Sequence, residues 1–498
     1  MTKPIKKIVI VGGGTAGWIS AALLKKVLGA LVDIELVESE EIGRIGVGEA
    51  TIPPIRHLNE VLGIDEAEFL RETKATIKLA IKFENWNQIG SGYFHTFGNQ
   101  GKPMAFCHFH HFWVRAMQSG LQSSLWDYDL NYACATANKF APIVAKDAML
   151  DLLYAYHFDA SLYANYLRKY SEKLGVTRTE GLIDQVQMHP DNGEITALVL
   201  RTGEKIEGDF FIDCSGLRGL LIQQQLDTGY EDWSHLLVND RAIALPSAGF
   251  AQTAPYTRAI AHSIGWQWQI PLQHRNGNGL VYSSKYCSDD EAAHVLLSNI
   301  ETEVLAEPNF ISFKTGRRLK QWNRNVIAVG LSSGFLEPLE STSIHLIQSA
   351  IVRLLKLFPH NGCSDSLRDE YNQQSKAEFE QVRNFIILHY FTNGRDDSQY
   401  WRDQRINQTP PELLHQINLF RETGRLYRKQ EDIFHDPSWV QVLIGQGIMP
   451  QDYHPLANSL SQHQLIEMLS DIKKIKQSPI AKLPTHDAFL QRVCGAAR

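Results

Sequence analysis

Three glycines and one acid carry the clearest chemical signal in the chain. Gly12, Gly14 and Gly17 follow an apolar run and fit the spacing G-x-G-x-x-G. In a dinucleotide site the first glycine allows a tight turn, the second lets the backbone approach a pyrophosphate, and the third lets the next helix pack on the strand. Glu38 follows about 20 residues later, where an acceptor for a ribose hydroxyl is expected. An acid there favours NAD or FAD over NADP.

The elements that would hold these residues indicate a dinucleotide-binding βαβ unit. Ile8–Val11 reads as a buried parallel strand, and Val32–Val37 reads as the next one. The N–H groups at the start of the intervening helix would face the phosphates. A strand-turn-helix without a ligand is the alternative. It is disfavoured because strand, glycines, helix, second strand and terminal acid all occur in one unit.

Later segments predict the rest of an α/β fold. Phe210–Asp213 and Asn325–Val329 are short apolar strands, each followed by small residues. FAD enzymes often place such a turn against the flavin phosphates. Residues 240–287 alternate as in a sheet, and from Ile344 onward the pattern is helical.

Several local expectations can be compared directly with a structure. Alternating apolar positions predict one strand over Thr76–Trp86. Residues 142–176 are predicted to be helical, and 176–213 to form antiparallel strands joined by turns. Asp65 is a predicted N-cap. The glycine- and asparagine-rich stretch 275–279 is predicted to be a hairpin turn.

Composition limits the class of protein. The chain has 498 residues, enough for one large composite core or two to three domains. A hydrophobic content of 44% and a charged content of 21% are ordinary for a soluble enzyme. The net charge of −6 lacks the basic excess that is typical of nucleic-acid-binding proteins, so no nucleic-acid partner is expected.

Cysteine usage and hydropathy bear on the cellular setting. The six cysteines form no C-x-x-C pair and suggest neither a zinc site nor a disulfide framework. A reducing cytoplasm is therefore expected. The N-terminal apolar run is short and interrupted by glycines, which predicts a first strand rather than a signal peptide. No apolar segment is long enough to span a bilayer, so no membrane association is expected.

Five motifs together resemble the flavin-dependent halogenases of the tryptophan-halogenase type. The motifs are GGGTAGW at 12–18, GEATIP at 48–53, FENW at 83–86, GWQWQIP at 265–271 and FLEPLEST at 335–342. The pattern W-x-W-x-I-P within the fourth is the most diagnostic. The resemblance runs from residue 12 to at least 342, and 435–455 is also similar to the family.

This resemblance implies a fold and a domain organisation. The expected fold is α/β, a FAD-binding, glutathione-reductase-like domain with an inserted antiparallel substrate sheet and a helical C-terminal cap. Residues 1–360 would form the FAD-binding domain with its inserted sheet. Residues 361–498 would form a helical subdomain packed on it. The oligomeric state is left open, with a homodimer among the alternatives.

The resemblance also implies a two-component reaction. A separate NAD(P)H-dependent flavin reductase supplies reduced FAD, which with oxygen and bromide or chloride gives hypohalous acid. The acid passes through an internal tunnel and halogenates an indole-like aromatic substrate. The chain has no second G-x-G-x-x-G, which favours delivery of reducing equivalents from elsewhere. The alternatives are a flavin monooxygenase that hydroxylates an aromatic ring, and a flavin-binding protein without turnover.

The residues of the cofactor and halide sites follow from the same resemblance. The family's halide is held by backbone N–H groups, here those of Thr342 and Ser343. The family usually has glycine where this chain has Ser343, so the halide preference is open. FAD contacts are implied for Gly12, Gly13, Gly14, Thr15, Ala16, Gly17, Glu38, Gly48, Glu49, Ala50, Leu331 and Ile344.

Lys78 and Glu340 match the catalytic lysine and glutamate of the family. A lysine ammonium can hydrogen-bond hypohalous acid and make its halogen more electrophilic, or form a haloamine when deprotonated. On spacing alone, Lys78 reads as a lysine on the solvent face of a strand, and Lys82 has the same parity. A glutamate can orient the oxidant and accept the proton released as the ring rearomatises. Glu340 could equally stabilise the next helix's N-terminus, and Glu337 is its competitor.

Aromatic residues are implied to shape the substrate site. Trp266 and Trp268 share a strand face and would wall the tunnel, or simply form a core pair. His95 and Phe97 match a substrate-stacking H-x-F motif suited to a flat, electron-rich ring. A structural histidine at 95 is an equal alternative. Lys74 is a further rival of Lys78.

Two other features bear on metal binding and on the substrate. His108, His110 and His111 lie in an aromatic run without a matching acid triad, so packing and surface roles are favoured and no metal is expected. Members that use free tryptophan carry a C-terminal clamp for the amino acid. Between residues 430 and 451 the chain offers Phe434, His435, Trp439 and an apolar helix. Indole or a larger aromatic is therefore expected in place of free tryptophan.

Overall fold

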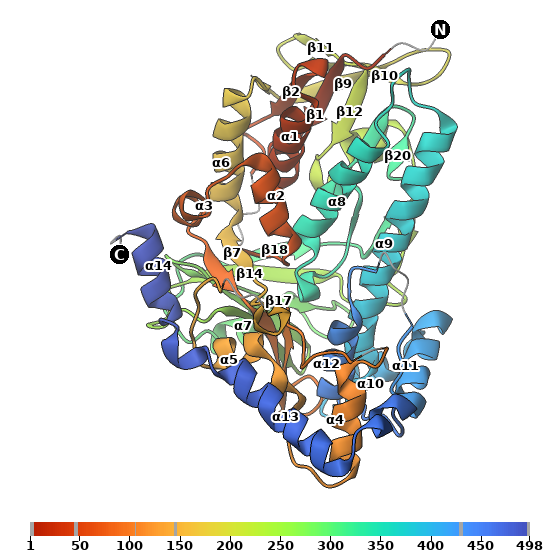
Figure 1. The fold of residues 1–498 in the computed structure, drawn as a ribbon. Helices are drawn as coiled ribbons and strands as arrows, with labels where there is room; N and C mark the ends of the chain where they lie inside the picture. The colour runs from red at the N-terminus through yellow and green to blue at the C-terminus, as the bar shows by residue number, and fades with distance from the viewer. Residues whose placement is uncertain (1–3, 44–47, 105, 144–146, 428–431, 496–498) are drawn as a thin grey trace. The chain divides into compact units, whose positions relative to one another are not determined.

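The protein divides into two compact units, each assembled from three stretches of chain (Figure 1). The computed structural model describes residues 4–43, 48–104, 106–143, 147–427 and 432–495. The units consist of Met1–Ala75, Phe158–Ser234 and Ser312–Glu380, and of Thr76–His157, His235–Ile311 and Gln381–Arg498. The sequence-based division cuts the chain once, into 1–360 and 361–498, whereas each compact unit combines three separate stretches. That division stays a prediction.

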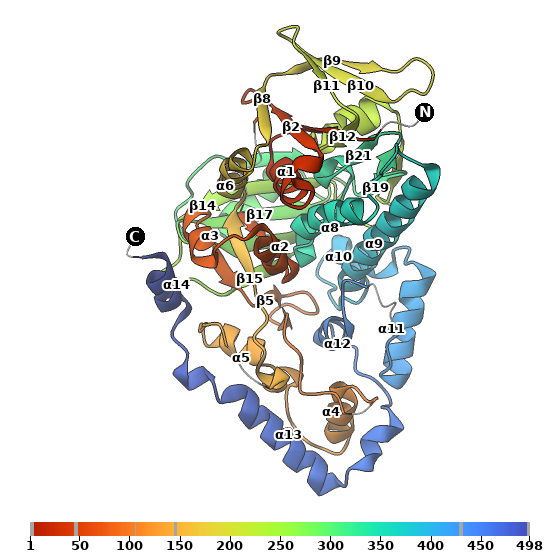
Figure 2. The same cartoon turned by 45° about the horizontal axis from the view of Figure 1, so that its top comes forward.

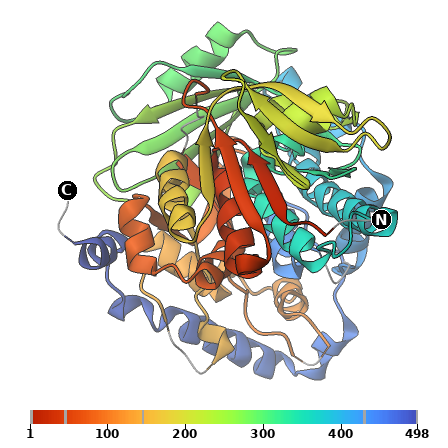
Figure 3. The same ribbon diagram turned by 90° about the horizontal axis from the view of Figure 1, so that it is seen from above.

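The first unit is built on a six-stranded sheet, which Figure 3 views from above with β1 and β2 in red. The pairings among five of its strands are parallel, namely those of β1, β2, β8, β12 and β21. The sixth strand, β20, pairs antiparallel with β21. The strand order is β20 (Trp322–Asn323), β21 (Val326–Ala328), β12 (Phe210–Asp213), β1 (Lys7–Val11), β2 (Asp33–Glu38) and β8 (Thr177–Glu180).

The apolar sequence of β1 explains its central place. Ile8, Val9 and Ile10 have no exposed surface, as expected for a strand with covered faces. Ile8 pairs with Phe210 on one side and with Ile34 on the other. The parallel sheet therefore gathers the carboxyl ends of β1, β2 and β12 at one edge, where ligands bind in folds of this kind.

In the described residues of the first unit, two smaller sheets and several α-helices accompany the six-stranded sheet. Helix α1 packs against α2, α6 and α8. The predicted antiparallel strands within 176–213 are present, and Asp65 caps α3 by accepting a hydrogen bond from the Glu68 N–H at 2.8 Å. One sheet has the strand order β11 (Lys205–Glu207), β10 (Ile195–Leu200) and β9 (Ile183–Met188). The other has the order β13 (Tyr230–Asp232), β19 (Gly316–Arg318) and β22 (Gly334–Phe335). The helices are α1 (Thr15–Leu28), α2 (Pro54–Leu62), α3 (Glu66–Glu72), α6 (Ala160–Lys173) and α8 (Ser343–Lys356).

The second unit is built on a seven-stranded sheet, mostly antiparallel. Its central strands β14, β17, β16 and β15 confirm the sheet predicted over 240–287. The order is β18 (Asn309–Ser312), β14 (Arg241–Ser247), β17 (Asn276–Tyr282), β16 (Gly265–Pro271), β15 (Tyr256–His262), β5 (Ala80–Glu84) and β6 (Gly92–Thr96). A separate short strand, β4 (Thr76–Lys78), pairs with β7 (Ala155–Asp159).

Helices surround this sheet within the second unit. Helix α7 covers one face of β14 and β17 through an apolar cluster that includes Leu245, Leu280 and Leu296. The long helix α13 runs past α4 and α5 (Figure 2). The helices are α4 (Phe109–Gln118), α5 (Leu130–Thr136), α7 (Asp289–Ser298), α10 (Gln399–Ile406), α11 (Pro411–Thr423), α12 (Asp436–Gly445), α13 (Gln462–Gln477) and α14 (His486–Cys494). Helix α9 (Asp365–Phe391) contributes residues to both units.

Three local predictions are wrong for identifiable reasons. The single strand predicted over Thr76–Trp86 is two strands, because Leu79 leaves the ladder and its N–H donates to the Pro255 carbonyl at 2.8 Å. The helix predicted over 142–176 is interrupted by the fully buried strand β7. The hairpin turn predicted at 275–279 lies earlier, closed by the Leu272 N–H and the Arg275 carbonyl at 2.9 Å.

The predicted fold class is confirmed in its main features. A parallel sheet opens the chain, an antiparallel sheet is inserted, and the secondary structure after β22 is helical in the residues described. Among those residues, no helix combines the length and the apolar character needed to cross a membrane.

Candidate functional site

The glycine loop between β1 and α1 has an open side. Gly12 adopts φ 109°, and a Cβ there would come within 2.4 Å of the Cys214 carbonyl oxygen. Around Gly14, by contrast, a Cβ would meet no heavy atom of the described residues within 4 Å. Thr15 and Ala16 begin α1 and are half-buried. The loop therefore presents an uncrowded helix N-terminus, as a pyrophosphate requires.

Glu38 ends β2 and lies directly against this loop. A Cβ on Gly13 would come within 1.5 Å of a Glu38 carboxylate oxygen, so only glycine fits there. The same carboxylate accepts a hydrogen bond from Arg178 Nε at 2.7 Å, and Arg168 lies 3.8 Å away. Arg178 therefore orients Glu38. The sequence spacing did not reveal this arginine as its partner. The role of Glu38 at a ribose stays a prediction.

The turn after β21 approaches the same loop. Gly330 adopts φ 71°, and a Cβ there would come within 2.9 Å of the Ala16 Cβ. The next residue, Leu331, is half-buried in a short 3-10 helix, Gly330–Ser332. The structure thus brings Leu331 beside the start of α1, as a flavin contact there requires.

The predicted halide residues lie at the N-terminus of α8. Ser341 is left-handed with φ 59°, and this turn directs the chain into the helix. Thr342 is the N-cap residue, is buried, and makes no side-chain cap bond. Ser343 is the first helical residue and is half-buried, and Ile344 follows it into the core. Main-chain N–H groups at such a position lack intrahelical partners and bind anions.

Two buried glutamates precede this turn. Glu340 is 1% exposed within a 3-10 helix, Pro338–Glu340, and Glu337 is fully buried just before it. Both are therefore shielded from solvent, and burial alone does not separate them. Glu340 lies three residues before Ser343, the first residue of α8, and Glu337 lies six before it, so the predicted helix-stabilising role of Glu340 stays alongside a catalytic one.

The segment Gly48–Ala50 forms a short strand, β3, in the first unit. Gly48 and Ala50 are buried and Glu49 is half-buried. Desolvation raises the pKa of Glu49 to about 7. The segment leads into α2, whose Pro54 carbonyl accepts a hydrogen bond from Gln348 of α8 at 3.1 Å. It therefore belongs to the same part of the unit as the halide turn.

Together these residues fit FAD. The open face at Gly14 leaves space where a side chain would stand in an ordinary turn, and the free N–H groups of α1 suit a diphosphate. All of the predicted flavin and halide residues lie in the first unit. Their roles at the flavin and the halide stay predictions.

Lys78 is the most unusual residue of the second unit. It is a lysine with no exposed surface, on the short strand β4. Its ammonium nitrogen lies 5.2 Å from the centroid of the Phe97 ring, within cation–π range. Lysines are almost never fully buried without a specific reason. The solvent-facing alternative for Lys78 is wrong.

Two buried histidines support this strand and were missed from the sequence. His157 of β7 lies between the hydroxyls of Thr76 and Thr257, each 2.9 Å from one ring nitrogen. Burial lowers the pKa of His157 well below its usual range, and nearby Lys78 lowers it further. His486 accepts the Ile77 N–H at 3.1 Å, and burial lowers its pKa to about 4. Two neutral imidazoles therefore support the strand that carries Lys78. Their distance from residue 78 in sequence left no local signal.

His95 belongs to an aromatic group on the same unit, and Phe97 lies two residues further along the chain. The His95 ring centroid lies 5.7 Å from Phe385 and 6.4 Å from Phe434. Phe385 and Phe434 stack at 3.8 Å with an interplanar angle of 11°. Phe97 is half-buried beneath Lys78. Phe385 comes from α9 and has no local sequence signal, whereas Phe434 lies in the segment 430–451 that was compared with the free-tryptophan clamp.

Trp266 and Trp268 share one face of β16, and their ring centroids are 6.2 Å apart. Both are largely buried. A Cβ on Gly279 of the neighbouring strand would come within 1.9 Å of the Trp268 ring. The glycines that suggested a turn therefore make room for an indole inside the sheet. Whether the pair walls a tunnel stays a prediction.

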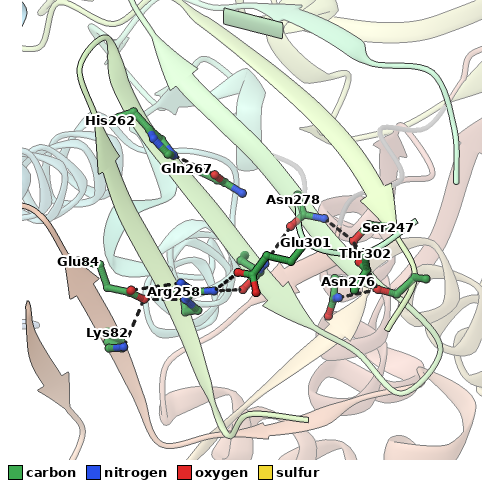
Figure 4. Close-up of polar contacts among 12 residues, drawn as sticks. Lys82, Glu84, Ser247, Arg258, His262, Gln267, Asn276, Asn278, Glu301 and Thr302 are labelled. Atoms are coloured by element: carbon green, nitrogen blue, oxygen red, sulfur yellow. Dashed lines mark hydrogen bonds and ion pairs between the residues drawn. The ribbon is translucent and has the colours of Figure 1, made fainter. Parts of the chain in front are cut away.

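The opposite face of the same sheet is polar (Figure 4). Arg258 donates to Glu84 at 2.6 Å and to Glu301 at 3.0 Å, and Lys82 lies 3.6 Å from Glu84. These ion pairs hold the Lys82 ammonium in a partly exposed network. Lys74, the third lysine considered, is half-buried with φ 52° and belongs to the first unit.

The histidines of α4 serve packing in the structure. His110 is buried and bonds the Gly424 carbonyl at 2.7 Å, and His111 accepts the His454 N–H at 3.2 Å. His108 is half exposed and lies 3.3 Å from Asp436. In the described ranges no group of three or more histidine, cysteine or acidic side chains could hold a metal ion.

The sequence matches a known family over most of its length. The profile described as tryptophan halogenase matches residues 7–462. Tryptophan 7-halogenase RebH of Lentzea aerocolonigenes is 33% identical over 99% of this chain and all of its own. Tryptophan 6-halogenase SttH of Streptomyces toxytricini is 36% identical over 84% of each chain.

The solved structures agree with this result. A flavin-dependent halogenase from Xanthomonas campestris superposes with a TM-score of 0.96, at 44% identity and with 99% of both chains covered. BrvH, a flavin-dependent halogenase from Brevundimonas, gives a TM-score of 0.95 at 41% identity, covering 98% of this chain and 99% of its own.

Proposed function

The chain belongs to the tryptophan halogenase family and is a flavin-dependent halogenase, and we propose that it halogenates an indole-like aromatic molecule other than free tryptophan. The observation that carries this proposal is the fully buried Lys78 above Phe97, two residues along the chain from His95, whose ring contacts Phe385 and Phe434. A flat, electron-rich ring suits such a group.

The flavin is assigned to the first unit. Bound reduced FAD supplies, with oxygen and halide, the hypohalous acid that the reaction consumes. Its pyrophosphate would bind at Gly12–Gly17, with Gly14 giving the close approach and Arg178 holding Glu38 for the ribose. Leu331 and Ile344 would contact the ring system, beside Gly48–Ala50.

The halide is assigned to the main-chain N–H groups of Thr342 and Ser343. These groups stand at the N-terminus of a 14-residue helix, where the helix dipole favours an anion. The Ser343 side chain occupies space that glycine would leave, so it adjusts the fit between bromide and chloride.

Lys78 is assigned the delivery of the halogen. An ammonium excluded from water donates strong hydrogen bonds, so it can hold hypohalous acid by oxygen and polarise the halogen toward the ring. His157 and His486 favour this role because they stay neutral beside it and add no competing charge. Glu340 is assigned the proton that leaves the ring carbon as aromaticity returns. Its burial raises the strength of any interaction it makes.

The substrate assignment rests on the residues around His95. Phe434 and Trp439 both pack on Phe385, Trp439 edge-on at 5.2 Å. Among residues 432–451, Phe434 is a ring contact of His95 and Gln441 bonds the neighbouring Thr96, and an aromatic contact suits a flat ring. Residues 430 and 431 lie outside the described residues. Trp266 and Trp268 are assigned to the wall of the oxidant's passage.

A separate NAD(P)H-dependent flavin reductase is the proposed partner. The chain carries one glycine-rich dinucleotide motif, and that motif is assigned to FAD. Reducing equivalents would therefore arrive as reduced FAD.

The discriminating experiment is a reconstituted reaction. Purified protein is incubated with FAD, a flavin reductase, NADH and bromide, with either indole or tryptophan, and products are identified by mass spectrometry. We expect brominated indole, with a higher kcat/KM for indole than for tryptophan. Brominated tryptophan formed with the higher kcat/KM would reject the substrate proposal. A product that is only hydroxylated would reject the halogenation mechanism.

A further inference from the structure

An unbroken series of tryptophan and tyrosine rings runs through the second unit from Trp268. Successive ring centroids are separated by 6.2, 6.4, 5.3, 5.0 and 5.4 Å. Each separation is within the range of direct aromatic contact. The series is Trp268, Trp266, Trp86, Trp401, Tyr400 and Tyr286.

The series passes from buried rings to a half-exposed one. Trp266, Trp86 and Trp401 have at most 1% exposed surface, and Tyr400 has 1%. Tyr286 is half-buried and follows β17 in a segment whose neighbours Ser284 and Lys285 are exposed. The series therefore joins the interior of the unit to solvent.

Tyr286 ends the series beside a base. Its hydroxyl donates to the Asp403 carboxylate at 2.7 Å. This hydrogen bond is the largest of the effects that lower the pKa of Asp403. The carboxylate is therefore ionised and can accept a proton. The hydroxyl of Tyr400 instead donates to the amide oxygen of Asn239 at 3.1 Å, and an amide is a poor base. Loss of an electron with a proton is therefore easier at Tyr286 than at Tyr400.

Charge along the series is balanced. The Arg395 guanidinium lies 5.0 Å from the Trp401 ring centroid, but Asp397 pairs with it at 2.7 Å. Lys285 donates to the Tyr286 oxygen at 3.2 Å and lies 3.8 Å from Asp403. A positive charge moving along the rings therefore meets cations that already have carboxylate partners.

We propose that these six rings form an electron-transfer path that carries oxidising equivalents away from Trp268 to Tyr286. The inference rests on the proposed exposure of Trp268 to the oxidant. An enzyme that makes hypohalous acid risks forming oxygen- or halogen-centred radicals when no aromatic substrate is bound. Tryptophan and tyrosine are the side chains best able to pass single electrons.

The electrons and protons balance in each step. Trp268 gives one electron to the radical, which becomes hydroxide or halide, and Trp268 becomes a radical cation. Each ring then gives one electron to its neighbour on the Trp268 side, until Tyr286 has lost an electron and passes its phenolic proton to Asp403. A thiol or ascorbate in solution gives a hydrogen atom to the Tyr286 radical. Asp403 then releases its proton to water.

A competing endpoint lies next to Trp86. The Tyr93 hydroxyl is 2.9 Å from His389 Nδ1, and His389 lies 5.8 Å from Trp86. Tyr93 is 5% exposed, so a radical there would be trapped in the interior. The two endpoints can be told apart by where a spin trap becomes attached.

The test uses the full chain loaded with FAD and a nitroso spin trap, with adducts located by mass spectrometry. One arm runs reduced flavin, oxygen and bromide without aromatic substrate. The second arm illuminates the FAD-loaded protein without halide, because photoexcited flavin is a one-electron oxidant. The second arm does not depend on halogenation, so it decides the proposal even if the proposed function fails. A parallel reaction with indole reports halogenation separately.

We expect an adduct on Tyr286. Trp401→Phe and Asp403→Asn should each lower the yield of the Tyr286 adduct severalfold. Tyr286→Phe should abolish the adduct and raise oxidation of Trp86 and Trp266. It should leave the initial halogenation rate unchanged. Tyr132→Phe is the matched control, since that half-buried tyrosine contacts Phe94 outside the series. The proposal is overturned if neither arm labels Tyr286, if Tyr93 is labelled in its place, or if Trp401→Phe leaves the Tyr286 adduct undiminished.

Discussion

Lys78 and Lys82 are four residues apart in sequence, yet one is fully buried and the other is paired at a partly exposed surface. Lys78 lies on β4 with its ammonium 5.2 Å from the Phe97 ring, while Lys82 lies on β5, 3.6 Å from Glu84. The break at Leu79 separates the two strands and therefore the two environments. This difference gives a matched pair of substitutions for testing the chemistry.

Removing the Glu340 charge should slow the reaction without loosening the cofactor. We expect Glu340→Gln to lower kcat by about 10²-fold or more, as removal of a general base does. Flavin affinity, followed by fluorescence titration, should stay within error of the parent protein. Glu337→Gln is the comparison, because that residue is equally buried. Equal losses of kcat in both variants would withdraw the specific assignment to Glu340.

Arg178 offers a test of the cofactor site that needs no turnover. Arg178→Gln leaves the Glu38 carboxylate without its 2.7 Å donor, so the acceptor for the ribose is less well oriented. We expect the Kd for FAD to rise about tenfold, the equivalent of one hydrogen bond. Lys205→Gln, whose exposed ammonium pairs with Glu207, serves as control. An unchanged Kd in Arg178→Gln would remove Arg178 from the site.

The serine at 343 should influence the choice of halide. In Ser343→Gly the main-chain N–H groups of α8 remain, but the side chain beside them is removed. We expect the ratio of brominated to chlorinated product, measured with both halides present, to change, while FAD affinity does not. A ratio equal to that of the parent protein would mean that the side chain does not contact the halide.

Acid should destabilise the protein through its buried histidines. The folded pKa of His486 is about 4 and its ordinary value is 6.5, so between these values the unfolded chain binds the extra proton. The free energy of unfolding should therefore fall as pH falls through this window, by about 1.4 kcal/mol per pH unit for this group. His486→Gln should flatten the fall in Tm between pH 6.5 and 4, and the exposed His57→Gln should not. Parallel Tm curves for parent and His486→Gln would contradict the assignment.

The proposed cofactor site can be predicted from sequence because its signals are local. Gly12, Gly14 and Gly17 lie within six residues, and a Cβ at Gly12 or Gly17 would clash with main-chain atoms. The substrate half was less accessible. Phe385 meets His95 only through tertiary packing, and His486 reaches Ile77 across most of the chain. No periodicity in a short window records such contacts.

Two errors show what pattern reasoning cannot see. Alternation treats Lys78 and Lys82 as equivalent, but the ladder is broken at Leu79 and the two residues enter different sheets. Glycine at 279 signals a turn by propensity, yet here it clears space for the Trp268 ring inside a strand. In both cases a neighbouring element decides the outcome.

Comparison of Lys78→Met with Lys82→Met tests the central claim most directly. Methionine keeps much of the apolar stem and removes the ammonium, and FAD binding and folding are checked first by titration and circular dichroism. With FAD, reductase, NADH, bromide and indole, we predict that brominated product falls about 100-fold or more in Lys78→Met. It should be unchanged in Lys82→Met. Brominated indole at the parent rate from a folded, FAD-binding Lys78→Met protein would contradict the account.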